Sequence, residues 1–450
     1  MNKYPFLLGF ALGALYWTIN VSWIFSAINF YGAGILFSIL ISSFLIIYLS
    51  LYIGVFAYIC SRFWDEKYFV LIAPSSFFLL EALRSYLLTG VPWLRLGMLA
   101  DELWGMLPLV GVAGTSFLIV LGVALLSKAK QSRFHVPLSG LIFLSLVFGP
   151  GHFQQQPESR TVKVAVIQPV DSNLTKLQTI TSSLDDDIVV WPEGVTRLDT
   201  IPLNNSKQVI VGGFYTVENN KIFNSIVNLN NGEKNNKRNL VPFGEFQPFN
   251  GALNNLSSFF VSPYFKDLTP GLINQEKLTV LGEAVSGLIC WELVFDQTFI
   301  KRTLNTGLIF HVSNDSWYGD SMPPQHFRHV KARAVESNKW VIRSTKDGIS
   351  AIISPSLSHN DQKILRGKEG YISETISFNN ENIDVEIVNQ TMGLTSQSFL
   401  LDLYINIVNG DIINANKVLH NIYKNGAAPK QIIDDLLNVT YSLISSLAAN

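Results

Sequence analysis

Apolar residues run almost continuously through the first 150 positions instead of alternating with polar ones. Each run approaches the roughly 20 residues that a helix needs to cross a bilayer. The pattern predicts a transmembrane domain over residues 1–152 with about five spans, near 5 to 28, 33 to 60, 69 to 89, 105 to 127 and 134 to 151. Only Lys3 precedes the first run, which has no clear small-residue cleavage site, so a cleavable signal peptide is not expected.

The pattern changes near residue 160 to short β-branched runs bounded by turn residues. Near-continuous apolar strands that alternate with helices predict an α/β domain with a buried sheet over residues 160–378. Helical periodicity is clearest from 325 to 337. The predicted strands cover 162 to 168, 188 to 191, 208 to 212, 225 to 229, 284 to 290, 307 to 313 and 350 to 353.

A third pattern occupies residues 379–450, which are polar, rich in Asn and without β-branched runs. Apolar residues recur there at helical spacing, which predicts a small all-α tail. No stretch in the tail is apolar for long enough to span a membrane. The predicted tail helices cover 399 to 408, 415 to 423 and 431 to 447.

The loops between the predicted spans differ in charge. Positive side chains favour the cytoplasmic side of a membrane, and they occur in two alternate loops, as Arg62 and Lys67 and as Lys128, Lys130 and Arg133. The amino terminus is then cytoplasmic. With five spans, everything after about residue 152 is expected on the opposite, periplasmic side.

Composition narrows the class of protein. Residues are 48% hydrophobic and only 15% charged, with a mean hydropathy of +0.26, which is too apolar for one soluble enzyme. A formal net charge of -1 gives no broad basic surface, so no nucleic-acid partner is expected. The two cysteines, of which Cys60 lies in an apolar run, exclude a disulfide framework and leave Cys290 unpaired.

Three residues supply a base, a cation and a nucleophile. Glu193, Lys237 and Cys290 each fall at the end of a predicted strand or in the turn after it, where open α/β sheets place reacting groups. A thiol becomes a good nucleophile when a carboxylate removes its proton and a cation stabilises the charge. Considered one at a time, Glu193 resembles a helix-start carboxylate, Lys237 a solvated surface charge and Cys290 a small buried hydrophobic residue.

The motifs around these residues resemble those of the carbon-nitrogen hydrolase (nitrilase-like) superfamily and, more closely, of the apolipoprotein N-acyltransferase family of the bacterial inner membrane. The segment from Glu81 to Leu94 resembles a transmembrane helix of that family that leads to a periplasmic loop. The resemblance implies an α-β-β-α sandwich and runs from about residue 5 to 378. The motifs are Trp191-Pro192-Glu193, Lys237 followed by Leu240-Val-Pro-Phe-Gly-Glu245-Phe, Ile289-Cys290-Trp-Glu292 and Ser313-Asn314-Asp315-Ser-Trp317-Tyr-Gly319.

The resemblance implies that Glu193 is the general base, Lys237 the oxyanion-stabilising cation and Cys290 the nucleophile. It also implies that Cys290 takes an acyl chain from a phospholipid as a thioester. The acyl chain then passes to the α-amine of the diacylglyceryl-cysteine that begins an apolipoprotein. Glu245 and Glu292 match supporting glutamates of the family. The implied partners are therefore a phospholipid donor, a diacylated apolipoprotein acceptor and the lipid bilayer, with no metal and no cofactor.

Four further residues are candidates for substrate binding: Arg84, Trp93, Asn314 and Trp317. A charge inside a span is costly in lipid, so Arg84 is a functional candidate, with Glu81 or a lipid phosphate as its partner. The sequence departs from the family at Trp291, where Tyr or Phe is usual, at Asn239, where His is common, and near Leu177, where Trp often stands. The family has about eight spans, so three are expected to be missing, two of them at the amino terminus.

The tail from about residue 383 resembles the helical collar domain of the DNA polymerase III gamma/tau subunit. Because no phosphate-binding Gly-Lys-Ser/Thr loop accompanies it, ATPase activity is not implied. The plainer interpretation is a polar helical tail joined by gene fusion, rearrangement or gene-prediction error.

Metal sites are not expected. A solvated turn is the better interpretation of Asp185 to Asp187, and helix-surface positions are the better interpretation of His326 and His329. Two other functions remain open: a nitrilase-type amidase acting on small amides, and an inactive membrane fragment whose tail binds partner helices.

Overall fold

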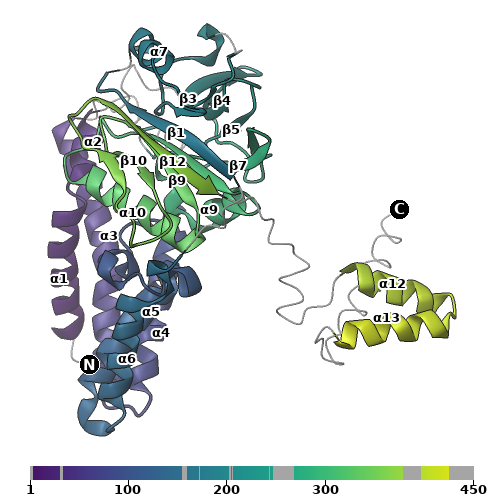
Figure 1. The fold of residues 1–450 in the computed structure, drawn as a ribbon. Coiled ribbons are helices and arrows are strands. Elements are labelled where there is room, and N and C mark those ends of the chain that lie inside the picture. Colours follow the sequence, from purple (N-terminus) through teal and green to yellow (C-terminus); the bar gives the residue numbers. More distant parts are fainter. Residues whose placement is uncertain are drawn as a thin grey trace. The chain divides into compact units, whose positions relative to one another are not determined.

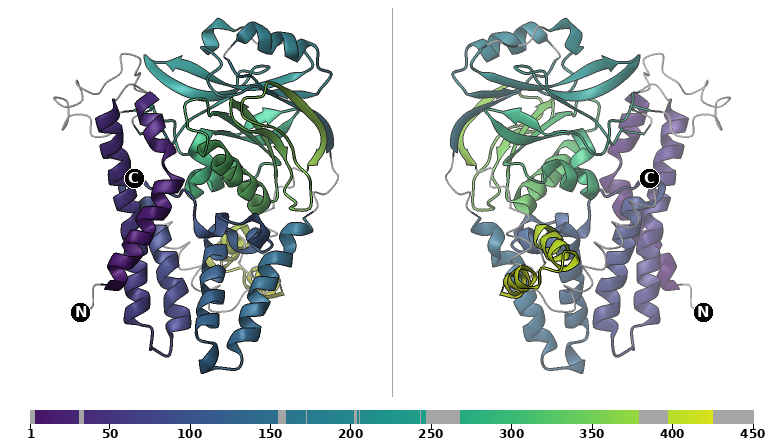
Figure 2. Two further views of the ribbon diagram at one scale, coloured as in Figure 1. Left: turned by 90° about the vertical axis from the view of Figure 1, so that its left-hand side faces the viewer. Right: turned by 90° about the vertical axis from the view of Figure 1, so that its right-hand side faces the viewer.

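The computed structural model describes residues 4–30, 34–154, 160–171, 173–201, 204, 206–242, 244–246, 268–378 and 397–424. It divides into two compact units, Met1–Asn380 and Glu381–Asn450. In the first unit, a bundle of helices adjoins a sandwich of two β-sheets (Figures 1 and 2).

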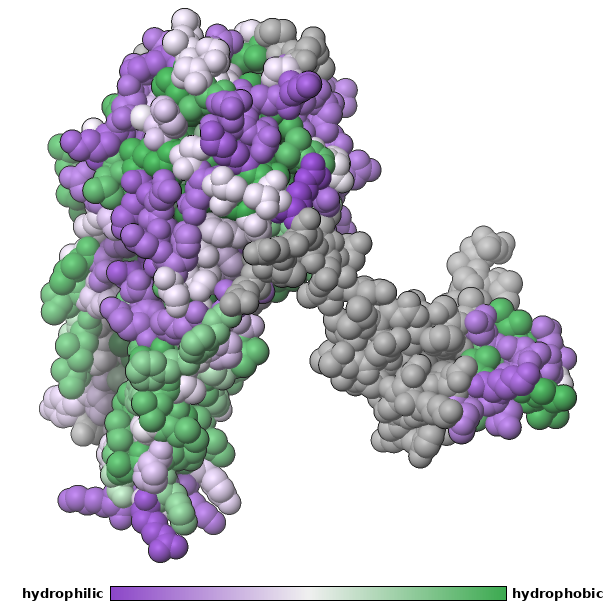
Figure 3. Space-filling model, viewed as in Figure 1, coloured by the Kyte–Doolittle hydropathy of each residue, from purple (hydrophilic) through white to green (hydrophobic). Residues whose placement is uncertain are grey.

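In the described part of residues 4–148, the amino-terminal bundle contains six helices: α1 (Tyr4–Asn20), α2 (Trp23–Phe30), α3 (Ile35–Arg62), α4 (Phe69–Tyr86), α5 (Leu107–Ser127) and α6 (His135–Phe148). Among the described residues, α3, α4 and α5 are long and apolar enough to cross a membrane. The α1 and α2 helices, bent by 52° at their break, would form a fourth span. Hydrophobic side chains gather over α5 and α6, whereas the sandwich surface in the same view is largely hydrophilic (Figure 3).

The fifth predicted span corresponds to α6, which has only 14 residues. At about 1.5 Å per residue it is roughly 21 Å long, shorter than the ~30 Å hydrocarbon core of a bilayer. Short 3₁₀ turns lie at the ends of the third and fifth predicted spans and in the loops between spans. These turns are η1 (Leu87–Thr89), η2 (Leu96–Met98), η3 (Asp101–Leu103), η4 (Ala129–Gln131) and η5 (Pro150–His152). The number of five spans stays a prediction.

Two six-stranded sheets form the sandwich. The first has the order β12 (Gly370–Phe378), β1 (Arg160–Gln168), β2 (Ile188–Val190), β3 (Val209–Glu218), β4 (Lys221–Asn228) and β5 (Lys234–Asn236). The second has the order β11 (Gln362–Ile364), β10 (Ser350–Ile353), β9 (Trp340–Lys346), β8 (Leu308–Asn314), β7 (Glu283–Ile289) and β6 (Leu278–Val280). The connecting helical segments are α7 (Leu174–Ser182), η6 (Leu198–Thr200), η7 (Cys290–Val294), α9 (Asp296–Thr303) and α10 (Met322–Ser337).

The main core lies between the sheets, where inward-facing residues of both sheets pack together, among them Val164, Val190, Phe310 and Ile342. A second apolar cluster joins α7 to the outer face of the first sheet, and a third joins α9 and α10 to the outer face of the second. The layers are therefore helix, sheet, sheet and helix (Figure 2). This confirms the expected α-β-β-α sandwich joined to apolar helices.

Two long strands had not been predicted. Strand β12 runs antiparallel to β1 with Arg160 opposite Phe378, so the carboxyl end of the unit closes the edge beside its first strand. Strand β9 pairs in parallel with β8. Its sequence, Trp-Val-Ile-Arg-Ser-Thr-Lys, carries polar side chains in a buried position, which masks the apolar pattern of an inner strand.

Helix α10 connects the sandwich to the bundle. Gln325 accepts hydrogen bonds at Oε1 from the indole nitrogens of Trp23 and Trp93, at 3.2 and 2.8 Å. His329, one turn on, accepts at Nε2 from the Leu94 amide at 3.1 Å. Arg333, a further turn on, binds Asp296, which also pairs with Arg95 of the η2 loop at 2.7 Å. These contacts fix the 91–99 segment against α10.

The second unit contains α12 (Gln397–Val408) and α13 (Ile412–Lys424). They correspond to the first two predicted tail helices. Asp411 caps α13, because its Oδ1 accepts from the Asn414 amide at 3.1 Å. The third predicted helix, 431 to 447, lies outside the described residues.

A chain ending at Asn380 should keep its fold, because β12 completes the first sheet before the boundary between the two units. Its thermal unfolding midpoint in detergent should differ from that of the full chain by less than about 4 °C. A chain ending at Gly367 is the matched control, since it also loses β12 and should not fold. A larger shift in the first variant would place tail residues in the fold of the first unit.

Candidate active site

The three predicted residues converge where strands of the two sheets end. Glu193 follows β2, Lys237 follows β5, and Cys290 follows β7 of the opposite sheet. The Lys237 Nζ lies 3.2 Å from Glu193 Oε1 and 2.8 Å from Glu245 Oε1. Close packing sets this geometry, because a Cβ atom at Gly213 would lie only 2.5 Å from the Glu193 Cα.

Asn224 of β4 holds the two carboxylates together, and the sequence had not singled it out. Its Nδ2 donates to Glu193 Oε1 at 2.6 Å and to Glu245 Oε1 at 3.1 Å. The second oxygens are held by backbone amides, Glu193 Oε2 by Asn314 and Glu245 Oε2 by Val241, each at 2.8 Å. The only signal was a polar residue at the edge of the strand predicted from 225.

Burial is the dominant influence on this cluster. It raises the pKa of Glu193, an effect that Glu245 reinforces and Lys237 opposes. Burial alone would lower the pKa of Lys237, but the attraction of Glu193 and Glu245 prevails and raises it well above its usual value. The lysine is therefore an ammonium group at neutral pH. Burial likewise raises the pKa of Cys290 to about 12, so the thiol is protonated until a base acts on it.

Cys290 begins the η7 turn in a left-handed backbone conformation, with φ of +54°. Glu292 stabilises the turn, because its Oε2 accepts from the Ile289 amide at 3.0 Å. Its Oε1 accepts from the amides of Arg238 and Asn239, next to Lys237. The carboxylate thus links the nucleophile turn to the lysine segment. Trp291 reaches the same segment, where its indole nitrogen donates to the Asn239 carbonyl at 2.6 Å.

A cavity of about 280 Å³ opens beside the carboxylates. Its wall includes two of the four candidate substrate-binding residues, Asn314 and Trp317. The cavity wall combines apolar side chains with the carboxylates of Glu193 and Glu245. Such a wall is typical of sites that take a ligand with a polar group and a hydrocarbon part. The other lining residues are Glu193, Arg197, Tyr215, Val217, Ile222, Gly244, Glu245 and Leu268.

The other two candidates lie in the helical bundle. Arg84 is buried, donates from Nη1 to the Trp93 carbonyl at 3.0 Å and lies over the Trp17 ring. Glu81, the expected partner, attracts Arg84 electrostatically, and its Oε1 also accepts from the Leu96 amide at 2.7 Å. Trp93 donates to Gln325, as described above. Both residues therefore fix the 91–99 segment in this structure.

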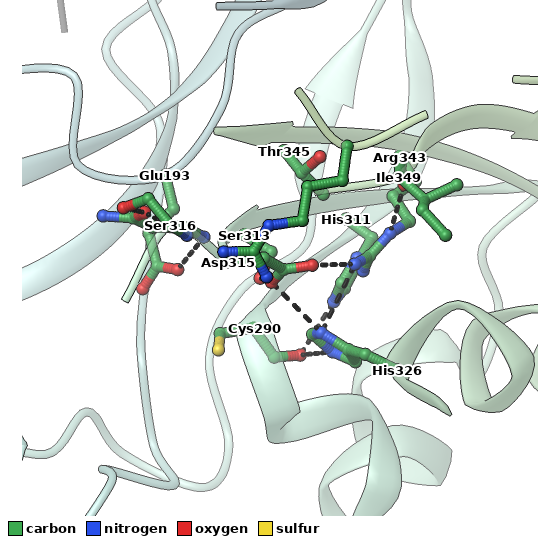
Figure 4. Close-up of polar contacts among 12 residues, drawn as sticks. Glu193, Cys290, His311, Ser313, Asp315, Ser316, His326, Arg343, Thr345 and Ile349 are labelled. Atoms are coloured by element: carbon green, nitrogen blue, oxygen red, sulfur yellow. Dashed lines mark hydrogen bonds and ion pairs between the residues drawn. The ribbon is translucent and has the colours of Figure 1, made fainter. Parts of the chain in front are cut away.

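The expectation of helix-surface histidines was wrong. His326 and His329 are both 0% exposed, because that face of α10 packs against the second sheet and the 91–99 segment. His326 lies at the carbonyl of Cys290 (Figure 4). In the acidic run, Asp185 and Asp187 are exposed, but Asp186 is buried and accepts from Ser373. Among the described residues, no group of three or more His, Cys, Asp or Glu could hold a metal ion.

Family models match three successive parts of the chain. The apolipoprotein N-acyltransferase N-terminal domain matches residues 2–125, and the carbon-nitrogen hydrolase model matches residues 195–380. The second match begins just after Glu193. Domain III of the DNA polymerase III subunits gamma and tau matches residues 383–450.

Similar proteins include an apolipoprotein N-acyltransferase from Wigglesworthia glossinidia brevipalpis, 32% identical over an alignment of 394 residues that covers 78% of this chain and 78% of the relative. Another, from Vibrio parahaemolyticus, is 28% identical over 392 residues and 77% of each chain. A carbon-nitrogen hydrolase superfamily structure from Xanthomonas campestris, 16% identical, covers 52% of this chain and 95% of its own, with a TM-score of 0.35.

The sandwich holds a cluster of buried acid, amine and thiol groups, and the carbon-nitrogen hydrolase model matches it. These observations define a carbon-nitrogen hydrolase domain joined to apolar membrane helices. Sequence identity to relatives over most of both chains specifies the family within this class: the chain belongs to the apolipoprotein N-acyltransferase family.

Replacing Asn224 by Ala should raise the pKa of Glu193 further, because the charged carboxylate loses a hydrogen bond. The acid limb of Cys290 alkylation by iodoacetamide should then move to higher pH, since Glu193 is a base only when deprotonated. Mass spectrometry of the Cys290 peptide gives the rate separately from that of Cys60. Asn228→Ala is the control, because Asn228 is equally buried on β4 but donates to the Thr279 carbonyl. An unshifted limb for Asn224→Ala would contradict the role of Asn224.

Proposed function

We propose that the chain transfers an acyl group from a phospholipid, through a thioester on Cys290, to the N-terminal diacylglyceryl-cysteine of an apolipoprotein. One observation carries the proposal: a base, an ammonium group and a thiol meet in a buried site of a chain from this family. The nitrilase-type amidase and the inactive fragment give no reason for retaining both this site and the membrane helices.

In the first step, Glu193 accepts the Cys290 proton while the sulfur attacks the ester carbonyl carbon of the phospholipid. Lys237 stabilises the oxyanion of the tetrahedral intermediate, which needs a cation that stays charged at neutral pH. The carbon–oxygen bond then breaks, and Glu193 returns the proton to the leaving oxygen of the lysophospholipid. The raised pKa of Glu193 suits it to both proton transfers.

In the second step, the α-amine of the lipoprotein attacks the thioester carbonyl. Glu193 accepts a proton from the amine, Lys237 again stabilises the oxyanion, and the carbon–sulfur bond breaks to release the amide. The departing sulfur recovers its proton from Glu193. Glu245 and Glu292 support these steps through their contacts with Lys237 and with the nucleophile turn.

A second cavity supports a lipid as the donor. About 310 Å³ in volume, it lies among α1, α3, α4 and the 91–99 segment and has mostly apolar walls. Trp17, Leu49 and Leu94 line it and also belong to an apolar cluster that reaches Trp291 and Trp317 beside the active site. We propose that Arg84 and Trp93 shape this path to the site, and that Asn314 and Trp317 contact substrate in the first cavity.

The domain boundaries follow from the same proposal. Residues 1–152 hold the enzyme in the bacterial inner membrane, and residues 160–378 carry out the chemistry on the periplasmic side. Residues 379–450 take no part in acyl transfer, because each residue to which a role is assigned lies before them. The orientation rests on the positive charges of the loops around Lys67 and Lys130.

Cys290→Ala and Cys290→Ser should both abolish thioester formation from a labelled phospholipid, because the sulfur forms the covalent bond. Glu193→Gln should do the same, since an amide cannot accept the thiol proton. Lys237→Ala should lose about a hundredfold or more through loss of oxyanion stabilisation. Acyl-enzyme is measured by gel after brief incubation in detergent, with Cys60→Ala as the control that keeps full activity.

Activity in both Cys290 variants would remove this residue from its proposed role. Hydrolysis of small amides without acyl-enzyme from phospholipid would favour the amidase, and neither activity in the native chain would favour the inactive fragment.

Single cysteines are introduced at positions 67, 130 and 220, and intact cells are then treated with a thiol-labelling reagent. The labelling should place Lys67 and Lys130 in the cytoplasm and Asn220 in the periplasm. The charge of the loops motivates this expectation. Asn220 is a suitable reporter because it lies in the exposed turn between β3 and β4. Cytoplasmic labelling at Asn220 would exclude the lipoprotein acceptor, whose amine is presented on the periplasmic face.

A further inference from the structure

Two buried imidazole rings contact the carbonyl oxygen of Cys290 (Figure 4). His311 Nε2, from the middle of β8, lies 2.7 Å from this oxygen. His326 Nε2, from α10, lies 3.3 Å from it. Both side chains are 0% exposed, so water does not replace either contact.

Both rings are neutral. Burial lowers the pKa of His311 well below its usual value, and the nearby Arg343 lowers it further. Burial and Arg343 also lower the pKa of His326. A neutral imidazole has a single N–H, and a carbonyl oxygen can only accept. A ring that donates to the Cys290 carbonyl therefore carries its hydrogen on Nε2.

Arg343 of β9 contacts both rings and holds His311 in this tautomer. Its Nη1 lies 2.8 Å from His311 Nδ1, and its Nη2 lies 3.3 Å from His326 Nδ1. Because a guanidinium group only donates, His311 Nδ1 must accept. His326 Nδ1 also lies 3.3 Å from Asp315 Oδ1, which can only accept, so Arg343 does not by itself set the tautomer of His326. The arginine is itself fixed by Asp315, at 2.9 Å, and by the Ile349 carbonyl, to which its Nε donates at 2.9 Å.

The nucleophile needs such support because its backbone is strained. With φ of +54°, Cys290 adopts a conformation that residues with side chains rarely take and that persists only where the surroundings impose it. Asp315 also belongs to the segment that holds the base: the amide of the preceding Asn314 donates to Glu193 Oε2. One buried network therefore reaches both the nucleophile and its base.

We propose that His311 and His326, oriented by Arg343 and Asp315, are positioning residues that hold the Cys290 carbonyl and thereby aim the thiol at Glu193 and Lys237. The inference rests on the proposed role of Cys290 as nucleophile. It assigns no proton transfer to His311, because the single hydrogen of this ring is committed to the carbonyl.

The test compares His311→Leu and His326→Leu with His329→Leu in the full chain. His329 is the matched control: it is equally buried and lies three residues from His326 on α10, but its Nε2 accepts from the Leu94 amide. The rate of acyl-enzyme formation at saturating labelled phospholipid should fall about tenfold to a hundredfold for His311→Leu, as expected when a reacting group is displaced. His326→Leu should lose less because its contact is longer. The half-saturating donor concentration should stay within about twofold, since binding groups are untouched.

Rescue separates positioning from simple packing. His311→Gln can still donate an N–H to the carbonyl and should recover much of the rate that His311→Leu loses. It also provides the measurement if the leucine variant does not fold. The acid limb of the pH–rate profile should stay at its native position in every histidine variant, because Glu193 remains the titrating base. Equal rates for His311→Leu and the native chain, an equal loss in His329→Leu, or a shifted acid limb would overturn the inference.

Alkylation of Cys290 by iodoacetamide provides a readout that needs no lipid. Slower alkylation in His311→Leu, with no acyl-enzyme in the native chain, would support the positioning network and reject the proposed function. Normal acyl-enzyme formation in the native chain, with unchanged alkylation and acylation in His311→Leu, would reject the network and leave the proposed function standing.

Discussion

A single buried ammonium group organises the active site. Lys237 is 1% exposed, and a cation removed from water is tolerated only where partners compensate its lost hydration. Glu193 and Glu245 supply that compensation, and Asn224 keeps their like charges together. Because these partners come from different strand ends, the need to pair one lysine dictates where several loops of the sandwich must meet.

The low polarity of the surroundings of Lys237, which makes charged partners necessary, also changes the acid-base properties of the other reacting groups. It raises the pKa of the Cys290 thiol and of Glu193, so the thiol is protonated at rest and the Glu193 carboxylate is a stronger base than an exposed one. Glu292 avoids conflict with this pair because backbone amides satisfy both of its oxygens. Backbone amides thus hold oxygens of the carboxylates at Glu193, Glu245 and Glu292, which limits reorganisation of the site during the reaction.

Sequence patterns predicted the parts of this protein that follow local rules. Apolar periodicity indicated the membrane helices and most inner strands, and the motifs around Glu193, Lys237 and Cys290 identified these three residues, although strand β5 before Lys237 had not been predicted. Asn224 and Arg343 were missed because their partners are distant in the chain and polar side chains inside strands interrupt the apolar signal. The buried histidines were assigned to a surface for a related reason: helical spacing shows which residues share a face, but not what covers it.

Helix α10 links the helical bundle to the nucleophile turn. Gln325 and His329 fasten it to the bundle, and His326, on the same two turns, touches the carbonyl of the nucleophile. At about 1.5 Å per residue, these three contacts lie within roughly 6 Å along one helix, so a single rigid element joins the bundle to the nucleophile turn. Any movement of the bundle against the sandwich would therefore also displace the carbonyl of the nucleophile.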